Sequence, residues 1–240
     1  MRWLPYTTSP VKGVRMRTQL RNGVLAGLAG GAVMSLVLLV AGEGPLQRAI
    51  DLEPGGGEEL VSRGGQRVGG VIAVLLVSAA LGLVFAVVTA ALRRARPLGI
   101  AAAGFVVLQL VPFLKYPPNP PGIGGSETVG RRTGLYLVLL AWGLVSLWAG
   151  WRARRWLEAR DLPGAVAQPA AAAAVVALVL FALAVLPPGP SPDAVPASVV
   201  WNFRIASLAG WAAYWSVLGT VFGWLALPAG LRRSPVPASD

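Results

Sequence analysis

Six long apolar runs without a charged side chain recur along this chain, and no other feature constrains its fold as strongly. A helix of about 20 residues crosses the roughly 30 Å of hydrocarbon in a bilayer. Charged residues make up 13% of the 240 residues, about half their share in an ordinary soluble domain. We therefore predict an all-α, polytopic integral membrane protein with six transmembrane helices. The predicted spans are 23–42, 68–92, 97–114, 133–151, 166–186 and 205–227.

The distribution of charge predicts the orientation of these spans. With both termini in the cytoplasm, the inner segments hold 14 of the 21 Lys and Arg residues, and the outer segments hold 7 of the 10 Asp and Glu residues. Loops rich in Lys and Arg stay on the cytoplasmic side. We expect a multi-pass protein of the cell's inner (plasma) membrane, with N- and C-termini cytoplasmic. If the alanine-rich run 166–186 does not insert, the last span reverses.

The spans divide the chain into a membrane domain and two tails. Residues 1–22 are polar and basic and contain two prolines, so we expect a disordered cytoplasmic tail. The membrane domain covers 23–227, and a second cytoplasmic tail covers 228–240. Glycines recur at four-residue spacing in the first and last spans, which permits close helix packing. Packing within one chain is favoured, and a homo-oligomer remains open; the glycines are Gly23, Gly27, Gly31, Gly219 and Gly223.

Missing residue types exclude several classes of function. The chain has no cysteine and no histidine, so it contains no disulfide, no thiolate metal site and no imidazole ligand. It also lacks a Gly-rich phosphate loop and paired aspartates within its spans. The arginines lie in short clusters between apolar runs, a pattern of membrane topology rather than of nucleic-acid binding. We predict no enzyme activity, no bound cofactor and no nucleic-acid partner, with the lipid bilayer as the surroundings.

The segment LVPFLKYPPNPPGIGG, at 110–125, interrupts the apolar sequence after the third span. Pro112 removes a helical hydrogen bond, and four residues that precede prolines are pushed toward extended geometry. We expect the helix to end near Lys115 and a stiff polyproline-like strut to follow. A surface turn with a snorkelling lysine is the simpler interpretation. The alternative is an entrance or re-entrant segment, since non-helical backbone at membrane depth requires protein or water around it.

Charged and polar residues around this segment are the candidates for a substrate path or gate. Glu127 can neutralise Lys115 or Arg132 across the loop, and Arg204 stands at the border of the last span, where it anchors the helix or pairs with an acid. The candidates are Lys115, Tyr116, Asn119, Glu127, Arg132 and Arg204.

The first outer loop holds the chain's one group of carboxylates. Hard oxygen ligands can collect a divalent cation at an outer entrance. Three arginines stand among them, so a solvated, charge-balanced loop is the simpler interpretation. The metal candidates are Glu43, Asp51, Glu53, Glu58 and Glu59.

Three blocks of the sequence resemble successive signature blocks of the CbtA family, described as a predicted cobalt transporter subunit. They read VSRGGQRVGG, FVVLQLVPFLKYPPNPPGIGGSETVGRRTGLYL and WNFRIASLAGWAAYWSVLGTVFGWL. The similarity extends from about residue 20 to residue 227. The resemblance implies an inner-membrane subunit for uptake of cobalt or a similar divalent cation, linked to cobalamin synthesis. The implied partner is CbtB, a small single-span protein with a histidine-rich end.

The chain departs from the family pattern in two ways. Some members look as if they carry a histidine-rich insertion in the first outer loop, where this chain reads EPGGGEE. Members are also usually described with five spans rather than six. Cobalt capture would then use carboxylates, Asn119, backbone carbonyls or a partner's imidazoles. Our leading hypothesis is a divalent metal transport subunit whose outer loops form the entrance; the alternative is a non-transporting membrane scaffold or assembly partner.

Overall fold

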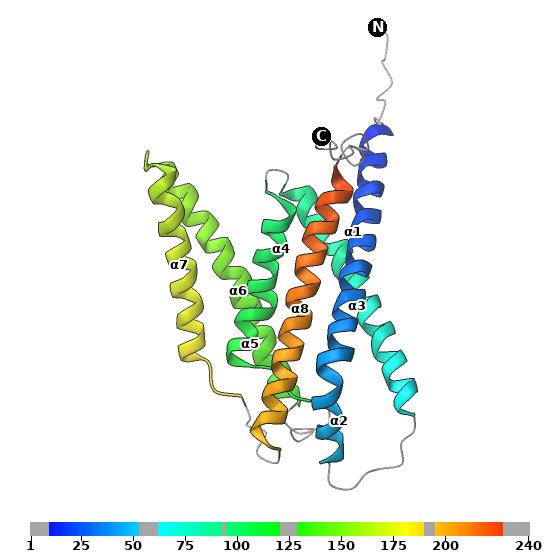
Figure 1. The fold of residues 1–240 in the computed structure, drawn as a ribbon. Coiled ribbons are helices and arrows are strands. Elements are labelled where there is room, and N and C mark those ends of the chain that lie inside the picture. Colours follow the sequence, from blue (N-terminus) through cyan, green and yellow to red (C-terminus); the bar gives the residue numbers. More distant parts are fainter. Residues whose placement is uncertain (1–9, 53–61, 93–94, 121–128, 190–194, 228–240) are drawn as a thin grey trace, which may run out of the picture. The chain divides into compact units, whose positions relative to one another are not determined.

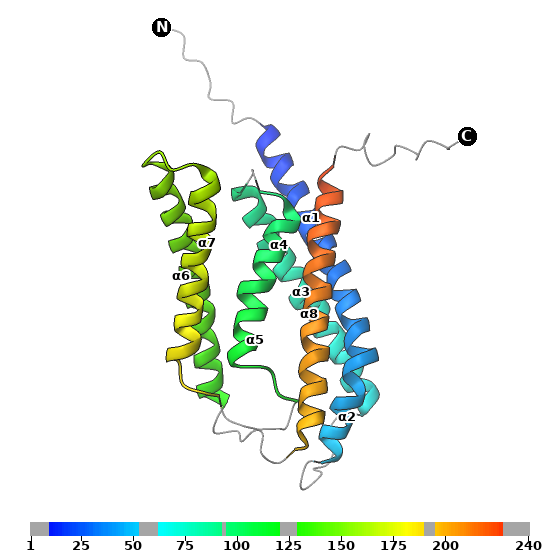
Figure 2. The ribbon, with the colours of Figure 1, turned by 60° about the vertical axis from the view of Figure 1, so that its left-hand side comes forward.

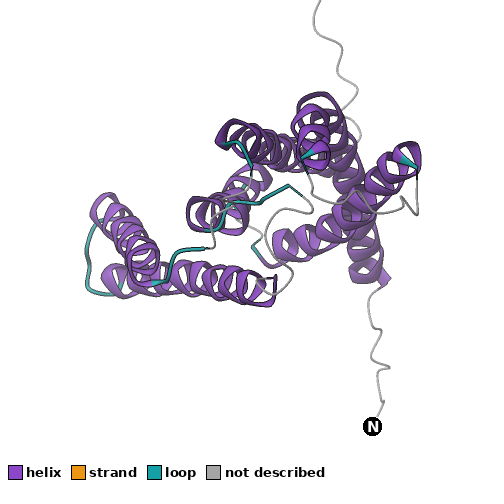
Figure 3. Ribbon diagram, turned by 90° about the horizontal axis from the view of Figure 1, so that it is seen from below, coloured by secondary structure: helices purple, strands orange, loops and turns teal. Residues whose placement is uncertain are grey.

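The computed structural model describes residues 10–52, 62–92, 95–120, 129–189 and 195–227. In these ranges the regular structure is helical and contains no strand (Figure 3). The elements are α1 (Pro10–Val37), η1 (Leu38–Gly42), α2 (Glu43–Asp51), α3 (Arg63–Ala91), α4 (Pro97–Phe105), η2 (Val106–Leu110), α5 (Val111–Lys115), α6 (Val129–Glu158), α7 (Gly164–Val185) and α8 (Ala197–Ala226). Six helical stretches among them are long and apolar enough to cross a membrane. The predicted all-α protein with six membrane-spanning helices is confirmed.

Several helices extend beyond the expected spans. α1 begins at Pro10, so part of the expected polar tail is helical. Proline is tolerated in the first helical turn, where its missing N–H would have no intrahelical partner. Helical structure then continues through the π-helical η1 and α2 to Asp51. α8 begins at Ala197, which places Arg204 two turns inside the helix rather than at its border.

The third helical stretch contains a π-helical segment immediately before its proline. α4, η2 and α5 follow one another without a break from Pro97 to Lys115. In an α-helix the N–H of residue 112 would donate to the carbonyl of Leu108, but Pro112 has no N–H. The hydroxyl of Tyr136 on α6 donates to that carbonyl at 3.1 Å. The helix ends at Lys115, as the sequence predicted.

The chain folds into two compact units. One contains residues 1–37, 59–102 and 212–240, and the other contains 38–58 and 103–211. In the first unit α1 packs closely on α3 (Figure 1). Gly23 faces Gly82, and a Cβ on Gly27 would collide with the carbonyl oxygen of Ser78. The close approach predicted from the α1 glycines is therefore present within the chain.

In the second unit α6 and α7 form an antiparallel hairpin, which Figure 2 shows from the side. The indole N–H of Trp142 on α6 donates to the carbonyl of Leu178 on α7 at 2.8 Å. The turn between them contains Asp161 at a φ of 59°, a left-handed conformation that Asp tolerates better than most residues. A small apolar cluster of Val111, Leu139 and Ala182 joins α5 to this hairpin. This unit carries the candidate site.

Candidate functional site

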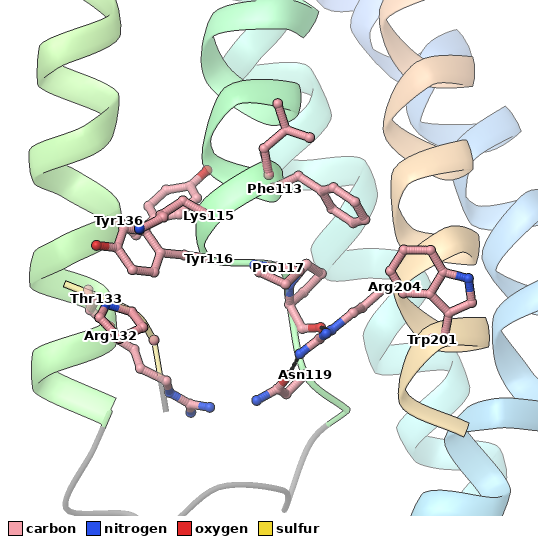
Figure 4. Close-up of a pocket in the computed structure, with 14 residues that line it drawn as sticks. Phe113, Lys115, Tyr116, Pro117, Asn119, Arg132, Thr133, Tyr136, Trp201 and Arg204 are labelled. Carbon is pink, nitrogen blue, oxygen red and sulfur yellow. Dashed lines mark hydrogen bonds between the residues drawn. The ribbon is translucent and has the colours of Figure 1, made fainter. Parts of the chain in front are cut away.

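A pocket of about 760 Å³ lies in the second unit, where α5 ends and α6 and α8 begin (Figure 4). α5, α6, α7 and α8 alternate in direction, so the C-terminal ends of α5 and α7 gather with the N-terminal ends of α6 and α8. The lining is a mixture of basic, aromatic and apolar side chains. It comprises Phe113, Leu114, Lys115, Tyr116, Pro117, Pro118, Asn119, Arg132, Thr133, Tyr136, Pro188, Gly189, Trp201 and Arg204.

The proline segment forms one wall of this pocket. Tyr116 closes the helix with a backbone hydrogen bond from its N–H to the carbonyl of Pro112 at 2.7 Å. Residues 117–120 carry no helical or strand structure, and the Pro120 side chain is fully buried. The Tyr116 hydroxyl donates to the carbonyl of Pro187, beyond the end of α7, at 2.8 Å. Desolvation raises the pKa of the Tyr116 phenol, and the positive charge of Arg131 opposes this rise.

Lys115 is fixed at the end of α5 by a contact with α7. Its ammonium Nζ donates to the carbonyl of Leu183 at 2.7 Å. That carbonyl belongs to the last turn of α7, where helical carbonyls lack intrahelical donors and carry partial negative charge. The half-buried lysine therefore satisfies a helix end and still lines the pocket.

Arg204 links α8 to the proline segment. Its Nη2 donates to Asn119 Oδ1 at 2.7 Å, and its Nε donates to the carbonyl of Pro118 at 3.3 Å. Figure 4 shows this side chain reaching from α8 to Asn119. Two hydrogen bonds from one planar guanidinium restrict the position of the proline segment more than a single hydrogen bond would.

Arg132 completes a set of three basic side chains around the pocket. It extends from the first turn of α6 into the lower part of the pocket in Figure 4. Among the described residues, no carboxylate and no carbonyl accepts a hydrogen bond from its guanidinium. The described lining contains no Asp or Glu. The described lining of the pocket is therefore positively charged.

Five of the six path or gate candidates meet in this pocket: Lys115, Tyr116, Asn119, Arg132 and Arg204. The sixth, Glu127, lies outside the described residues, so its pairing stays a prediction. Sequence reasoning did not select Tyr136 or Thr133. Tyr136 follows Arg132 by four positions, a spacing that places both on one helix face and could have identified it. The contacts of Lys115 with Leu183, of Tyr116 with Pro187 and of Arg204 with Asn119 depend on tertiary packing.

Comparison with known proteins gives the family. The model for the family described as "Probable cobalt transporter subunit (CbtA)" matches residues 16–227, a range that contains all six candidate spans. This chain belongs to the CbtA family. No match was found among curated proteins or among solved structures. The resemblance seen in the three sequence blocks is thereby confirmed.

For a CbtA family member, the metal candidates of the first outer loop are of direct interest. Glu43 and Asp51 stand at opposite ends of α2, which separates them by about 12 Å along the axis. Asp51 Oδ1 accepts a hydrogen bond from Gln47 Nε2 at 2.9 Å. Among the described residues, no group of three or more Asp, Glu, His or Cys side chains could hold a metal ion. Glu53, Glu58 and Glu59 lie outside the described residues, so outer-loop capture stays a prediction.

Proposed function

We propose that this chain is the multi-pass subunit of an uptake system for a divalent metal, with cobalt as the substrate. The main support for the proposal is the family match, which covers all six candidate membrane spans. The system supplies cobalt for cobalamin synthesis, as the family resemblance implies. The chain lies in the inner (plasma) membrane with both termini cytoplasmic, an orientation favoured by its distribution of Lys and Arg.

The metal ligands of this system come mainly from a partner. Imidazole is a preferred cobalt ligand, and this chain has no histidine and no cysteine. The pocket around Lys115, Arg132 and Arg204 is also a poor cation site, because its described lining is basic. Near a protein surface, two unit charges of the same sign 4 Å apart repel each other by about 4 kcal/mol, so each basic side chain opposes the binding of a metal cation. We therefore assign cobalt capture to a small, histidine-rich, CbtB-like membrane subunit, assisted by the loop carboxylates.

A non-transporting scaffold is the second candidate function. The observation that favours it is the lack of a three-residue metal-ligand group in the part of the chain that the structure describes. In that role residues 117–119, which Arg204 holds in place, would form a docking surface for the transporting partner.

Cobalt uptake into reconstituted vesicles separates these two functions. Four preparations are compared: empty vesicles, the chain alone, the CbtB-like partner alone, and both proteins together. The transport hypothesis expects Co²⁺ accumulation that requires this chain, either alone or with the partner. Uptake by the partner alone that equals uptake by both proteins would support the scaffold. No uptake in any preparation would contradict the transport proposal.

Two substitutions test the entrance formed by the outer loops. Lys115→Ala removes the contact that joins α5 to α7 beside the proline segment, and Glu127→Gln removes a carboxylate of the outer loop. Each is expected to reduce Co²⁺ uptake by several-fold while the protein still reaches the membrane. The matched control is Lys12→Ala, because Lys12 is the chain's other lysine and precedes the first predicted span. If both outer-loop variants transport as well as the control, the entrance model is wrong.

A further inference from the structure

Three basic side chains from three separate elements line one pocket whose described walls carry no carboxylate. Lys115 comes from α5, Arg132 from α6 and Arg204 from α8. Nothing in cation transport requires this arrangement, since positive charge repels the cargo. The pocket instead has the charge of an anion site.

Within the part of the chain that the structure describes, all three groups keep hydrogen-bond donors without an acceptor. An ammonium carries three N–H donors and a guanidinium carries five. Lys115 directs one donor to Leu183, and Arg204 directs two to Pro118 and Asn119. The guanidinium of Arg132 has no acceptor among the described residues. An anion in the pocket could therefore accept several charge-assisted hydrogen bonds without breaking the contacts that hold Lys115 and Arg204.

Helix lengths place these groups at one depth in the membrane. The 19-residue stretch that ends at Lys115 measures about 28 Å at 1.5 Å per residue. From Arg132 to Trp151 on α6 is about 29 Å, and from Arg204 to the end of α8 is about 33 Å. Each length is close to the roughly 30 Å of the hydrocarbon layer. If the far ends of these three segments lie at the opposite border of the bilayer, all three basic groups stand at the border between hydrocarbon and headgroups.

The remaining lining suits a ligand that is part polar and part apolar. Leu114 and Trp201 line the pocket and are 62% and 56% exposed. Tryptophan favours the headgroup level of a bilayer. The pocket volume of about 760 Å³ lies within the usual range for small-molecule sites, about 300 to 1,000 Å³.

We propose that this basic pocket binds a phosphate group. Guanidinium groups match phosphate geometry with paired donors, and phosphate is the anion that lipids concentrate at this depth. Basic pockets between transmembrane helices bind anionic lipid headgroups on the cytoplasmic or matrix side of other membrane proteins, and the same charge pairing is available at the outer ends of these helices. The depth of the three groups favours the headgroup of an anionic phospholipid over free phosphate. Phosphate binding here does not depend on which cation the protein carries.

Neighbouring arginines supply a matched pair of variants. Arg132 lines the pocket, whereas Arg131 is exposed and does not line it. Arg131→Gln and Arg132→Gln therefore change the net charge equally at adjacent positions. Arg132→Lys keeps the charge and tests whether the loss follows from charge or from altered folding.

The experiment is native mass spectrometry of the detergent-purified full chain, titrated with phosphatidylglycerol. Phosphatidylcholine with the same acyl chains is the zwitterionic comparison, and inorganic phosphate, followed by thermal stabilisation, is the free anion. Arg132→Gln should weaken phosphatidylglycerol binding about tenfold, the loss of about one charge-assisted hydrogen bond. Arg131→Gln should change it less than twofold, and Arg132→Lys should retain most of the affinity.

Comparison of the three ligands also identifies the source of the phosphate. Selective binding of phosphatidylglycerol that Arg132→Gln weakens supports a lipid headgroup. Stabilisation by inorganic phosphate alone, lost in Arg132→Gln, supports free phosphate. Equal effects of Arg131→Gln and Arg132→Gln, or equal binding of the two lipids without a phosphate effect, would overturn the site. Phosphate binding that appears only after Glu127→Gln would also overturn it, because the loop carboxylate would then be the occupant.

Discussion

The ammonium of Lys115 donates to the carbonyl of Leu183 at 2.7 Å, although the two residues lie 68 positions apart in the sequence. The contact joins the C-terminal end of α5 to the C-terminal end of α7. Both ends carry carbonyls that lack helical donors and bear partial negative charge. The positive charge of Lys115 therefore offsets the partial negative charge of two helix ends, at the place where the proline segment begins.

Replacing Lys115 by methionine should destabilise the fold. The side chain keeps its length and apolar stem but loses the charge-assisted hydrogen bond to Leu183. Such bonds contribute about 1.5 to 3 kcal/mol, and half-burial of Lys115 places the expected loss at the lower end of that range. Thermal unfolding in detergent, read by circular dichroism, measures the effect. Lys12→Met is the control, and equal midpoints for the two variants would show that the contact adds no stability.

The hydrogen bond between Arg204 and Asn119 should appear as a coupling energy between the two side chains. We expect Arg204→Gln and Asn119→Ala each to destabilise the chain, and the double variant to lose less than the sum. Partly buried charged hydrogen bonds give couplings of about 1 to 2 kcal/mol. The largely exposed pair Arg154 and Glu158, which are 2.7 Å apart, should give about 0.3 to 0.5 kcal/mol. Additive losses for Arg204 and Asn119 would contradict the assigned contact.

Much of the fold could be predicted from the sequence because membrane insertion depends on local composition. Each uncharged run is long enough to cross the bilayer, and the backbone must satisfy its own hydrogen bonds there, so each run becomes a helix. The end of α5 could also be predicted from neighbouring residues, because the prolines after Lys115 cannot continue a helix. The start of α8 at Ala197 does not follow from the last uncharged run, because the helix continues past Arg204 beyond the apolar sequence, and there Arg204 contacts Asn119.

The candidate site could be predicted only in part. Unusual composition identified Lys115, Tyr116 and Asn119, and charge next to a span identified Arg132 and Arg204. Their meeting in one pocket depends on contacts over 68 to 86 positions, which no local pattern encodes. The pairing of Glu127 with Lys115 or Arg132 stays a prediction, because Glu127 lies outside the described residues.

Because α1 packs closely on α3, we expect Gly→Ala substitutions in this contact to lower stability far more than Gly→Ala substitutions outside it. Gly27→Ala should strongly destabilise the chain, because the new Cβ would meet the backbone carbonyl of Ser78, which cannot move aside. Overpacking of this kind costs about 1 to 3 kcal/mol. Gly134→Ala on α6 is the control, since nothing lies within 4 Å of its Cβ position. Thermal unfolding of both variants measures the difference, and a Gly27→Ala midpoint at or above that of Gly134→Ala would contradict the packing.

The hydrogen bond from Tyr136 to Leu108 should matter because Pro112 is present. Tyr136→Phe removes the hydroxyl that donates to the Leu108 carbonyl. Leaving a partly buried carbonyl without this donor costs about 1 to 3 kcal/mol, so Tyr136→Phe should lower the unfolding midpoint. Pro112→Ala restores the backbone N–H that an α-helix would direct at the same carbonyl.

The two substitutions are therefore expected to be non-additive. In the Pro112→Ala background, Tyr136→Phe should cost less than half of what it costs in the native chain, because the alanine N–H replaces the hydroxyl as donor. Pro112→Ala also removes packing at this buried position, and the double-variant cycle subtracts that loss. Thermal unfolding of the native chain, both single variants and the double variant gives the coupling. An unchanged cost of Tyr136→Phe in both backgrounds would show that the hydroxyl does not substitute for the missing helical donor.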